Sequence, residues 1–238
     1  MLLQVKDLNT YYGESHVLQN MSLDVHDGEI IALLGRNGMG KSTTLKSILG
    51  LVRPKSGTVL FQGKDVTKFP PYKTARAGIG YVPEERRIFP NLSVLDNLKM
   101  GIKHGAAAKS GGENKWTIER IFDHFPFMKA RTHQKGALLS GGEQQMLAIG
   151  RTLMGNPDLL LVDEPTEGLA PVTVKEVRDI LAEINKAGVS ILLVEHNLKV
   201  AMSLTDRVYL MGKAHLGFTG TKAELEARPD IRAKYLEV

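Results

Sequence analysis

The stretch "GRNGMGKST" (residues 35–43) matches the spacing G-x-x-x-x-G-K-[ST]. It follows the apolar run "EIIALLG" (29–35), and we expect a helix from about Lys41 to Leu49. In this strand–loop–helix context, glycines let backbone N–H groups converge on phosphate oxygens, and the helix N-terminus adds partial positive charge. The sequence therefore predicts a phosphate-binding loop. The other interpretation is a glycine-rich turn that binds no ligand, but such a turn does not need a strand before it and a helix after it.

Each residue of this loop has an expected role. Lys41 is predicted to reach the β- and γ-phosphates, and Ser42 is predicted to ligate Mg²⁺. The rest of the predicted nucleotide cradle consists of Gly35, Arg36, Asn37, Gly38, Met39, Gly40 and Thr43.

Two further apolar runs end in polar residues. "LLLVDEP" (159–165) places Asp163 where it can hold Mg²⁺ and Glu164 where it can orient or deprotonate an attacking water. "LLVEHN" (192–197) puts His196 just past a strand, at the sheet edge where ligands collect, so we expect it to contact the γ-phosphate. Alone, an acid pair at a strand end is usually a solvated edge, and a lone histidine is usually structural. Together with the phosphate-binding loop, both patterns favour phosphoryl chemistry.

The rest of the chain predicts an α/β core that is interrupted by helices. Residues 2–28 predict antiparallel strands, and strands and helices alternate from residue 155 onward. "HGAAAKSGGEN" (104–114) predicts a surface connection. The predicted fold is a P-loop NTPase core of mainly parallel sheet with an N-terminal antiparallel β subdomain and an inserted α-helical subdomain.

Composition limits the class of protein. The chain has 238 residues, of which 42% are hydrophobic and 24% charged, as in an ordinary globular protein. It has no cysteine, which excludes disulfides and cysteine-based metal sites. We find neither an apolar run of about 18–20 residues nor a secretory signal, so we expect a cytoplasmic protein. The net charge of +5 predicts a solvated surface suited to anionic ligands and no nucleic-acid partner.

"LSGGEQQMLAIGR" (139–151) raises the question of a second phosphate site. Ser140 is expected to cap a helix together with Glu143, in a capping box. Capping does not explain Gly141 and Gly142, each of which costs about 1 kcal/mol of helix propensity. Close approach of a ligand to bare backbone would explain them. We therefore predict that Ser140, Gly141 and Gly142 bind phosphate.

The phosphate-binding loop, "LSGGEQQ", "LLLVDEP" and "LLVEHN" follow one another in this order along the chain. With these four motifs, the sequence resembles the ATP-binding subunit of an ABC transporter over essentially the whole chain. The resemblance implies one ATP-binding domain over residues 1–238, with its core at 1–84 and 155–238 and a helical subdomain at about 85–154. It implies a head-to-tail dimer with a second ATP-binding subunit, identical or closely related. Each "LSGGEQQ" helix would then face the γ-phosphate held by the opposite subunit. Adenine would stack on Tyr12, with Tyr11 as the runner-up and packing of the ring into the core as the other interpretation.

The chain departs from the family pattern at two positions. "YVPEERRIFPNLSV" places Glu84 where the family usually has glutamine, and a carboxylate oxygen there remains a good ligand for Mg²⁺. "EGLAP" places Ala170 where the family usually has aspartate, which removes one carboxylate from the contact between subunits.

"VPEERRIFP" and "EGLAP" are similar to the subfamily that serves branched-chain amino acid importers. This resemblance implies an ATPase that uses ATP and Mg²⁺, lies peripherally on the inner face of the cell membrane, and works with integral membrane permease subunits. A solute-binding protein would act indirectly. Importers of urea, other amides or aromatic amino acids stay open. A soluble ATP-driven clamp in translation or DNA repair and a small-molecule phosphotransferase are the alternatives from other classes.

Overall fold

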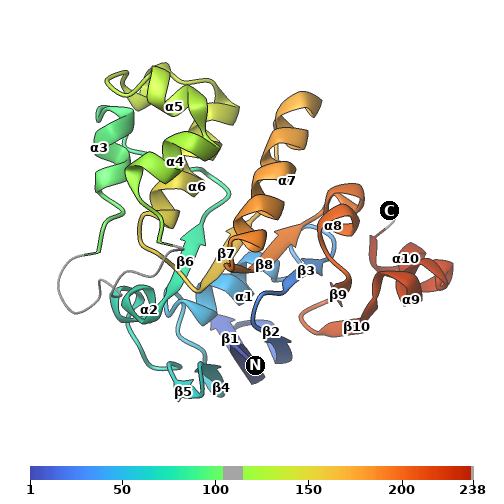
Figure 1. Cartoon of the computed structure of the whole chain (residues 1–238). Helices are drawn as coiled ribbons and strands as arrows, with labels where there is room; N and C mark the ends of the chain where they lie inside the picture. The colour runs from blue at the N-terminus through green and yellow to red at the C-terminus, as the bar shows by residue number, and fades with distance from the viewer. Residues whose placement is uncertain (104–114, 237–238) are drawn as a thin grey trace. The chain divides into compact units, whose positions relative to one another are not determined.

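The computed structural model describes residues 1–103 and 115–236, so the predicted surface connection at 104–114 lies outside the described residues. The chain packs as two compact units, whose elements are labelled in Figure 1. Unit 1 consists of Met1–Ala75 and Ser190–Val238, and unit 2 consists of Arg76–Val189. Unit 2 therefore contains two strands and a long helix besides the predicted helical stretch. The domain boundaries expected from the sequence stay a prediction.

Unit 1 contains an antiparallel sheet with the strand order β2-β1-β4-β5. Its strands are β1 (Leu3–Tyr12), β2 (Ser15–Val25), β4 (Ser56–Phe61) and β5 (Lys64–Asp65). β1 and β2 form a hairpin in which Tyr12 pairs with Ser15. Leu3, Val5 and Leu8 are buried, while the polar residues between them face outward. The predicted antiparallel strands at 2–28 are therefore confirmed.

Unit 1 also contains parallel strands made of the apolar runs. β3 (Ile30–Leu34) pairs in parallel with β8 (Ser190–Glu195) and with β9 (Arg207–Met211), and β10 (Leu216–Thr221) runs antiparallel to β9. Every residue of β3 and β8 is buried, as expected for parallel strands covered on both faces. The helices of this unit are α1 (Lys41–Ile48), α8 (Leu198–Leu204), α9 (Lys222–Glu226) and α10 (Pro229–Leu236).

An ion-pair network fixes the start of β9 in unit 1. Arg207 Nε lies 2.7 Å from Glu29 Oε1, and Arg207 Nη2 lies 3.0 Å from Asp24 Oδ2. The Tyr209 hydroxyl donates to Asp24 Oδ1 at 3.0 Å. Burial alone would raise the pKa of the Glu29 carboxyl, but the hydrogen bonds from Arg207 and the His26 backbone, with the Arg207 charge, hold that pKa below its ordinary value. The network therefore joins residues that are far apart in the sequence.

Unit 2 combines a pair of parallel strands with helices. β6 (Ile79–Val82) pairs with β7 (Leu159–Asp163). The helical segments are α3 (Val94–Lys99), α4 (Ile118–His124), α5 (Pro126–Ala130), the 3₁₀ turn η2 (Gly136–Leu138), α6 (Gly141–Leu153) and α7 (Pro171–Lys186). α2 (Pro71–Ala77) lies where the chain passes from unit 1 to unit 2. No helix in the described ranges has the length and apolar character needed to cross a bilayer.

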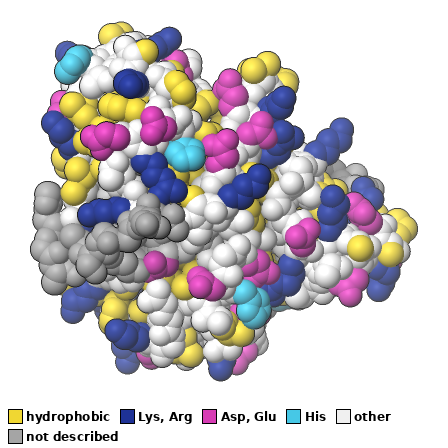
Figure 2. Space-filling model, in the orientation of Figure 1, with side chains coloured by type: hydrophobic (Ala, Val, Ile, Leu, Met, Phe, Trp, Pro, Cys, Tyr) yellow, Lys and Arg dark blue, Asp and Glu magenta, His cyan; other side chains and the backbone are white. Residues whose placement is uncertain are grey.

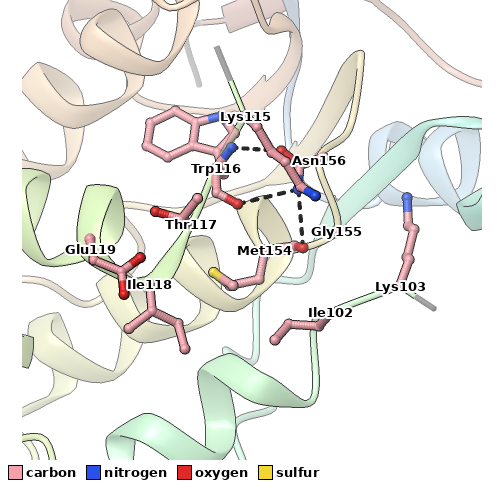
Figure 3. A pocket seen from close by; sticks show the side chains of 10 residues that line it. All are labelled: Ile102, Lys103, Lys115, Trp116, Thr117, Ile118, Glu119, Met154, Gly155 and Asn156. Carbon is pink, nitrogen blue, oxygen red and sulfur yellow. Dashed lines mark hydrogen bonds between the residues drawn. The ribbon is translucent and has the colours of Figure 1, made fainter. Parts of the chain in front are cut away.

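Two local contacts hold the helices of unit 2. Trp116 N donates to Asn156 Oδ1 at 2.6 Å, and Asn156 Nδ2 donates back to Trp116 O at 3.3 Å (Figure 3). These bonds anchor the chain entering α4 to the end of α6, beside a cavity of about 250 Å³. His124 Nδ1 lies 2.9 Å from Glu183 Oε2, which joins α4 to α7. Figure 2 shows acidic and basic side chains interspersed over the region of these helices.

Candidate functional site

The phosphate-binding loop begins where β3 ends, in unit 1. Gly40 caps α1 with a φ of 101°, a left-handed conformation that favours glycine. A Cβ added there would lie 2.8 Å from the Met211 terminal methyl carbon and 2.9 Å from a Leu18 methyl carbon. The left-handed backbone therefore favours glycine at this N-cap, and the side chains around it leave little room for a Cβ.

The ammonium group of Lys41 lies inside this loop. Its Nζ donates to Gly35 O at 2.9 Å and to Arg36 O at 3.1 Å, and the side chain is buried. Ser42 is half-buried in the first turn of α1, and Thr43 is buried behind it. Arg36, Asn37 and Gly38 form the exposed rim, and Met39 is half-buried. The loop therefore presents exposed backbone around a cation that its own carbonyl groups hold in place.

Unit 1 brings His196 to the same edge as this loop. Leu34 and Glu195 are partners in the parallel ladder between β3 and β8. The next residues, Gly35 and His196, therefore leave the sheet side by side. His196 is exposed, and Asn197 after it caps α8 by accepting a hydrogen bond from Val200 N. The predicted histidine thus lies beside the start of the phosphate-binding loop.

The two candidate aromatic residues differ in exposure. Tyr11 stacks on the His16 ring with centroids 4.0 Å apart, and Lys55 Nζ lies 4.9 Å from the Tyr11 centroid. Tyr12, at the end of β1, is 47% exposed. Because Tyr11 already stacks within the chain, the open ring of Tyr12 is the better surface for a base.

The predicted acids lie at the end of β7, in unit 2. Asp163 is buried, and the Tyr81 hydroxyl donates to its Oδ2 atom at 3.0 Å. Burial and the negative charge of Asp163 raise the pKa of the Tyr81 hydroxyl, so this group stays a donor. Glu164 is 8% exposed and has a φ of 43°, a conformation that costs a residue other than glycine roughly 1–2 kcal/mol. Backbone strain at a buried acid is consistent with a functional role.

Glu84 belongs to the same acidic cluster. Burial raises the pKa of its carboxyl, and the charges of Glu164, Asp163 and Glu167 raise it further. Carboxylate oxygens that repel one another are a suitable donor set for a hard divalent cation, whose charge removes the repulsion. Hard carboxylate donors of this kind fit Mg²⁺, and within unit 2 the charges of Asp163 and Glu164 act on Glu84.

The capping box at the start of α6 is present as predicted. Ser140 Oγ accepts from Glu143 N at 3.3 Å, and Glu143 Oε2 accepts from Ser140 N at 2.8 Å. The two glycines have different surroundings. A Cβ on Gly141 would lie 2.9 Å from an Arg86 guanidinium nitrogen, whereas a Cβ on Gly142 would overlap the methyl group of Thr173. Packing within the chain therefore supplies a second reason for Gly142, besides approach of a ligand.

Ala170 and two apolar side chains are found near this helix in the fold. Ala170 is the N-cap of α7 and makes no side-chain capping bond. Leu138, just before the capping box, is 68% exposed, and Val172, next to Thr173, is 72% exposed. Each of these exposed apolar side chains lies within a few residues of the first turn of α6 or of Thr173, which packs on that turn.

Sequence reasoning did not single out Tyr81, Thr173 or Arg86. Tyr81 lies three residues before Glu84, but its contact with Asp163 depends on the pairing of β6 with β7, which the sequence does not specify. Arg86 and Thr173 carry no local signal, since each contact depends on how α6 packs within unit 2.

Comparison with known proteins agrees with this geometry. The sequence pattern of the family described as ABC transporter matches residues 18–167. The chain is 37% identical to BraG, the high-affinity branched-chain amino acid transport ATP-binding protein of Pseudomonas aeruginosa, over 99% of each chain. It is 31% identical to LptB, the lipopolysaccharide export system ATP-binding protein of Haemophilus influenzae, over 99% of this chain and 97% of LptB.

A solved structure shows the same fold. It is a dimeric ATP-binding cassette in a post-hydrolysis state, bound to ADP and phosphate, with a TM-score of 0.77 and 26% identity over 92% of this chain and 98% of that one. The predicted family, fold class and ATPase activity are thus confirmed. Because the family pattern spans more than half of the chain and BraG is similar over almost all of it, the chain belongs to the ABC transporter family, as an ATP-binding subunit that hydrolyses ATP.

Proposed function

We propose that this subunit powers an importer of branched-chain or other hydrophobic amino acids. The observation that carries the proposal is the 37% identity to BraG over nearly the whole of both chains. The subunit would lie on the cytoplasmic face of the membrane, bound to integral permease subunits. A solute-binding protein would deliver the amino acid to the permease and reach this chain only indirectly.

The proposed roles within the site follow the chemistry of each side chain. Tyr12 stacks on adenine, and Lys41 and the loop from Gly35 to Thr43 bind the phosphates. Ser42, Asp163 and Glu84 hold Mg²⁺, which neutralises phosphate charge when it is bound. Glu164 accepts a proton from the attacking water, and His196 donates a hydrogen bond to the γ-phosphate.

We also propose that two subunits share each nucleotide. Ser140, Gly141 and Gly142 would face the γ-phosphate held by the partner's loop, where the α6 N-terminus favours negative charge. Two observations support this arrangement: the dimeric relative bound to ADP and phosphate, and the exposure of the apolar side chains of Leu138 and Val172. The partner is a second copy of this chain or a close relative.

Reconstitution with its transporter partners tests the proposed substrate. The subunit is produced with candidate permease and solute-binding proteins from the same organism, and ATP hydrolysis is measured in proteoliposomes. We expect leucine, isoleucine or valine, together with the binding protein, to raise hydrolysis several-fold, and Lys41→Ala to abolish that response. Stimulation by urea or acetamide and not by these amino acids would assign a different solute.

Lipopolysaccharide export is a second candidate, because LptB is similar over almost the whole chain. The two functions differ in the partner that binds and in the substrate that stimulates hydrolysis. Stimulation by lipopolysaccharide in liposomes, without a solute-binding protein, would favour export over import.

A further inference from the structure

We propose that Tyr81 is a positioning residue for Asp163, holding by its hydroxyl group the carboxylate that binds the nucleotide-associated cation. The inference rests on the proposed function, since it assigns a role to Tyr81 in the same site. Its basis is the hydrogen bond from the Tyr81 hydroxyl to Asp163 Oδ2, 3.0 Å long, between residues 82 positions apart.

The ladder between β6 and β7 determines this contact. Tyr81 pairs with Leu161, and Val82 pairs with Val162. Side chains alternate along a strand, so Asp163, two residues after Leu161, lies on the same face as Tyr81. A tyrosine side chain is long enough to cover that diagonal step, whereas a shorter polar side chain at the same position would not reach the carboxylate.

The position of Tyr81 is itself fixed. The Thr152 hydroxyl donates to Ala148 O at 2.9 Å and also lies 3.3 Å from Tyr81 O, which places α6 directly against β6. A Cβ on the preceding Gly80 would lie 2.8 Å from the Thr152 methyl carbon and 3.1 Å from Leu160 Cδ1. β6 is therefore packed closely on this side, and the phenol ring extends from a backbone with little freedom to move.

The surroundings of Asp163 give this hydrogen bond its importance. Asp163 is 1% exposed. The negative charges of Asp163, Glu164 and Glu167 raise the pKa of the Glu84 carboxyl, which shows that these acids influence one another. A buried carboxylate among like charges is repelled by its neighbours unless a donor holds it. A carboxylate has about four acceptor positions, so one O–H donor orients the group and leaves acceptor capacity for a cation. Hydrogen-bond partners of metal ligands typically contribute about 10–100-fold to metal affinity.

Replacement of Tyr81 by phenylalanine removes the donor and keeps the ring. We would measure Mn²⁺ binding to the full chain by electron paramagnetic resonance, with a non-hydrolysable ATP analogue present. We expect Tyr81→Phe to bind Mn²⁺ about 10-fold more weakly than the parent. Binding of the same analogue without a divalent cation should stay the same, and excess Mg²⁺ should restore much of the lost hydrolysis.

Tyr209→Phe is the matched control, because the Tyr209 hydroxyl also donates to an aspartate, Asp24, at 3.0 Å. We expect this variant to bind Mn²⁺ as the parent does. Equal Mn²⁺ affinity of Tyr81→Phe and the parent would overturn the assignment, as would an equal loss in Tyr209→Phe. A parent protein that binds no Mn²⁺ in the presence of nucleotide would instead overturn the proposed cation-binding roles of Ser42, Asp163 and Glu84, and the assignment with them.

Discussion

Gly142 and Thr173 are in direct contact, because the Thr173 methyl group occupies the space that a Cβ of Gly142 would need. The contact joins the first turn of α6 to the first turn of α7. It ties the proposed phosphate-binding tip to the segment that follows the proposed catalytic acids.

This contact predicts that the two neighbouring glycines differ in tolerance. Gly142→Ala should lower the free energy of unfolding by about 1–3 kcal/mol, the usual effect of overpacking. Gly141→Ala should change it little, since its nearest neighbour is the mobile end of Arg86. Urea unfolding measures both, and Thr173→Ser, which removes the methyl group, should restore the stability of Gly142→Ala. Equal losses in the two alanine variants would contradict this packing.

Glu164→Gln tests the general base. Turnover should fall by about 10²–10⁴, because the side chain can no longer accept a proton from water. The variant should also accumulate an ATP-bound dimer. Phosphate release and size-exclusion chromatography measure the two effects, and Glu176→Gln, an exposed position on α7, is the control. Parental turnover in Glu164→Gln would exclude this base.

Glu84→Gln tests the acidic cluster. The Glu84 pKa is raised in the folded state, so its protonation contributes stability below its ordinary pKa of 4.5, and this contribution is lost as pH rises through the raised value. Above that pH, and without Mg²⁺, the glutamine variant should unfold at a higher temperature than the parent.

Hydrolysis should persist in Glu84→Gln, with weaker dependence on Mg²⁺. Glu85→Gln is the matched control, because Glu85 pairs with Arg87, 2.9 Å away. Identical Mg²⁺ titrations of Glu84→Gln and the parent would count against coordination by Glu84.

Ala170→Asp should stabilise the chain. Ala170 has the extended backbone of an N-cap but no side-chain acceptor, and an aspartate there would accept a hydrogen bond from the first turn of α7. The expected gain in unfolding free energy is about 1 kcal/mol. Ala170→Asn separates the hydrogen bond from the charge. A loss of stability in both variants would show that the cap geometry is unsuitable.

The network around Arg207 predicts a pH-dependent stability. The Glu29 pKa is lowered on folding, so its stabilising contribution is present above the ordinary value of 4.5 and disappears as pH falls through the lowered value. Glu29→Gln should lower the unfolding free energy by about 1–3 kcal/mol at neutral pH. Urea unfolding should show this difference shrinking in acid, whereas Glu14→Gln, at the exposed hairpin turn, should show none.

Local signals account for what the sequence predicts well. The phosphate-binding loop, the buried runs of β3, β7 and β8 and the capping box of α6 each depend on residues close together in the chain. The apolar spacing of Ile118, Ile121, Phe122 and Phe125, with Pro126 after it, predicts a helix that stops before the proline, and α4 stops at His124. Phe125 then serves as the N-cap of α5, which the periodicity of the preceding run did not predict.

Contacts between distant residues could not be predicted in this way. Tyr81 meets Asp163 across 82 positions, and Glu29 meets Arg207 across 178. Such contacts depend on the register of paired strands, which residue types alone do not specify. The left-handed backbone at Glu164 likewise has no signal in the residue itself, because it is imposed by the turn after β7.

The bonds between Lys41 and the carbonyl groups of its own loop have a consequence for nucleotide recognition. The ammonium group is buried, and its N–H groups contact Gly35 O, Arg36 O and the Asn37 side-chain oxygen. When a phosphate binds, the Lys41 ammonium therefore exchanges protein acceptors for phosphate oxygens. The side chain is already ordered before the phosphate arrives. Preorganisation of this kind reduces the entropic penalty of association, so affinity depends on how well phosphate oxygens outcompete the oxygens of the loop itself.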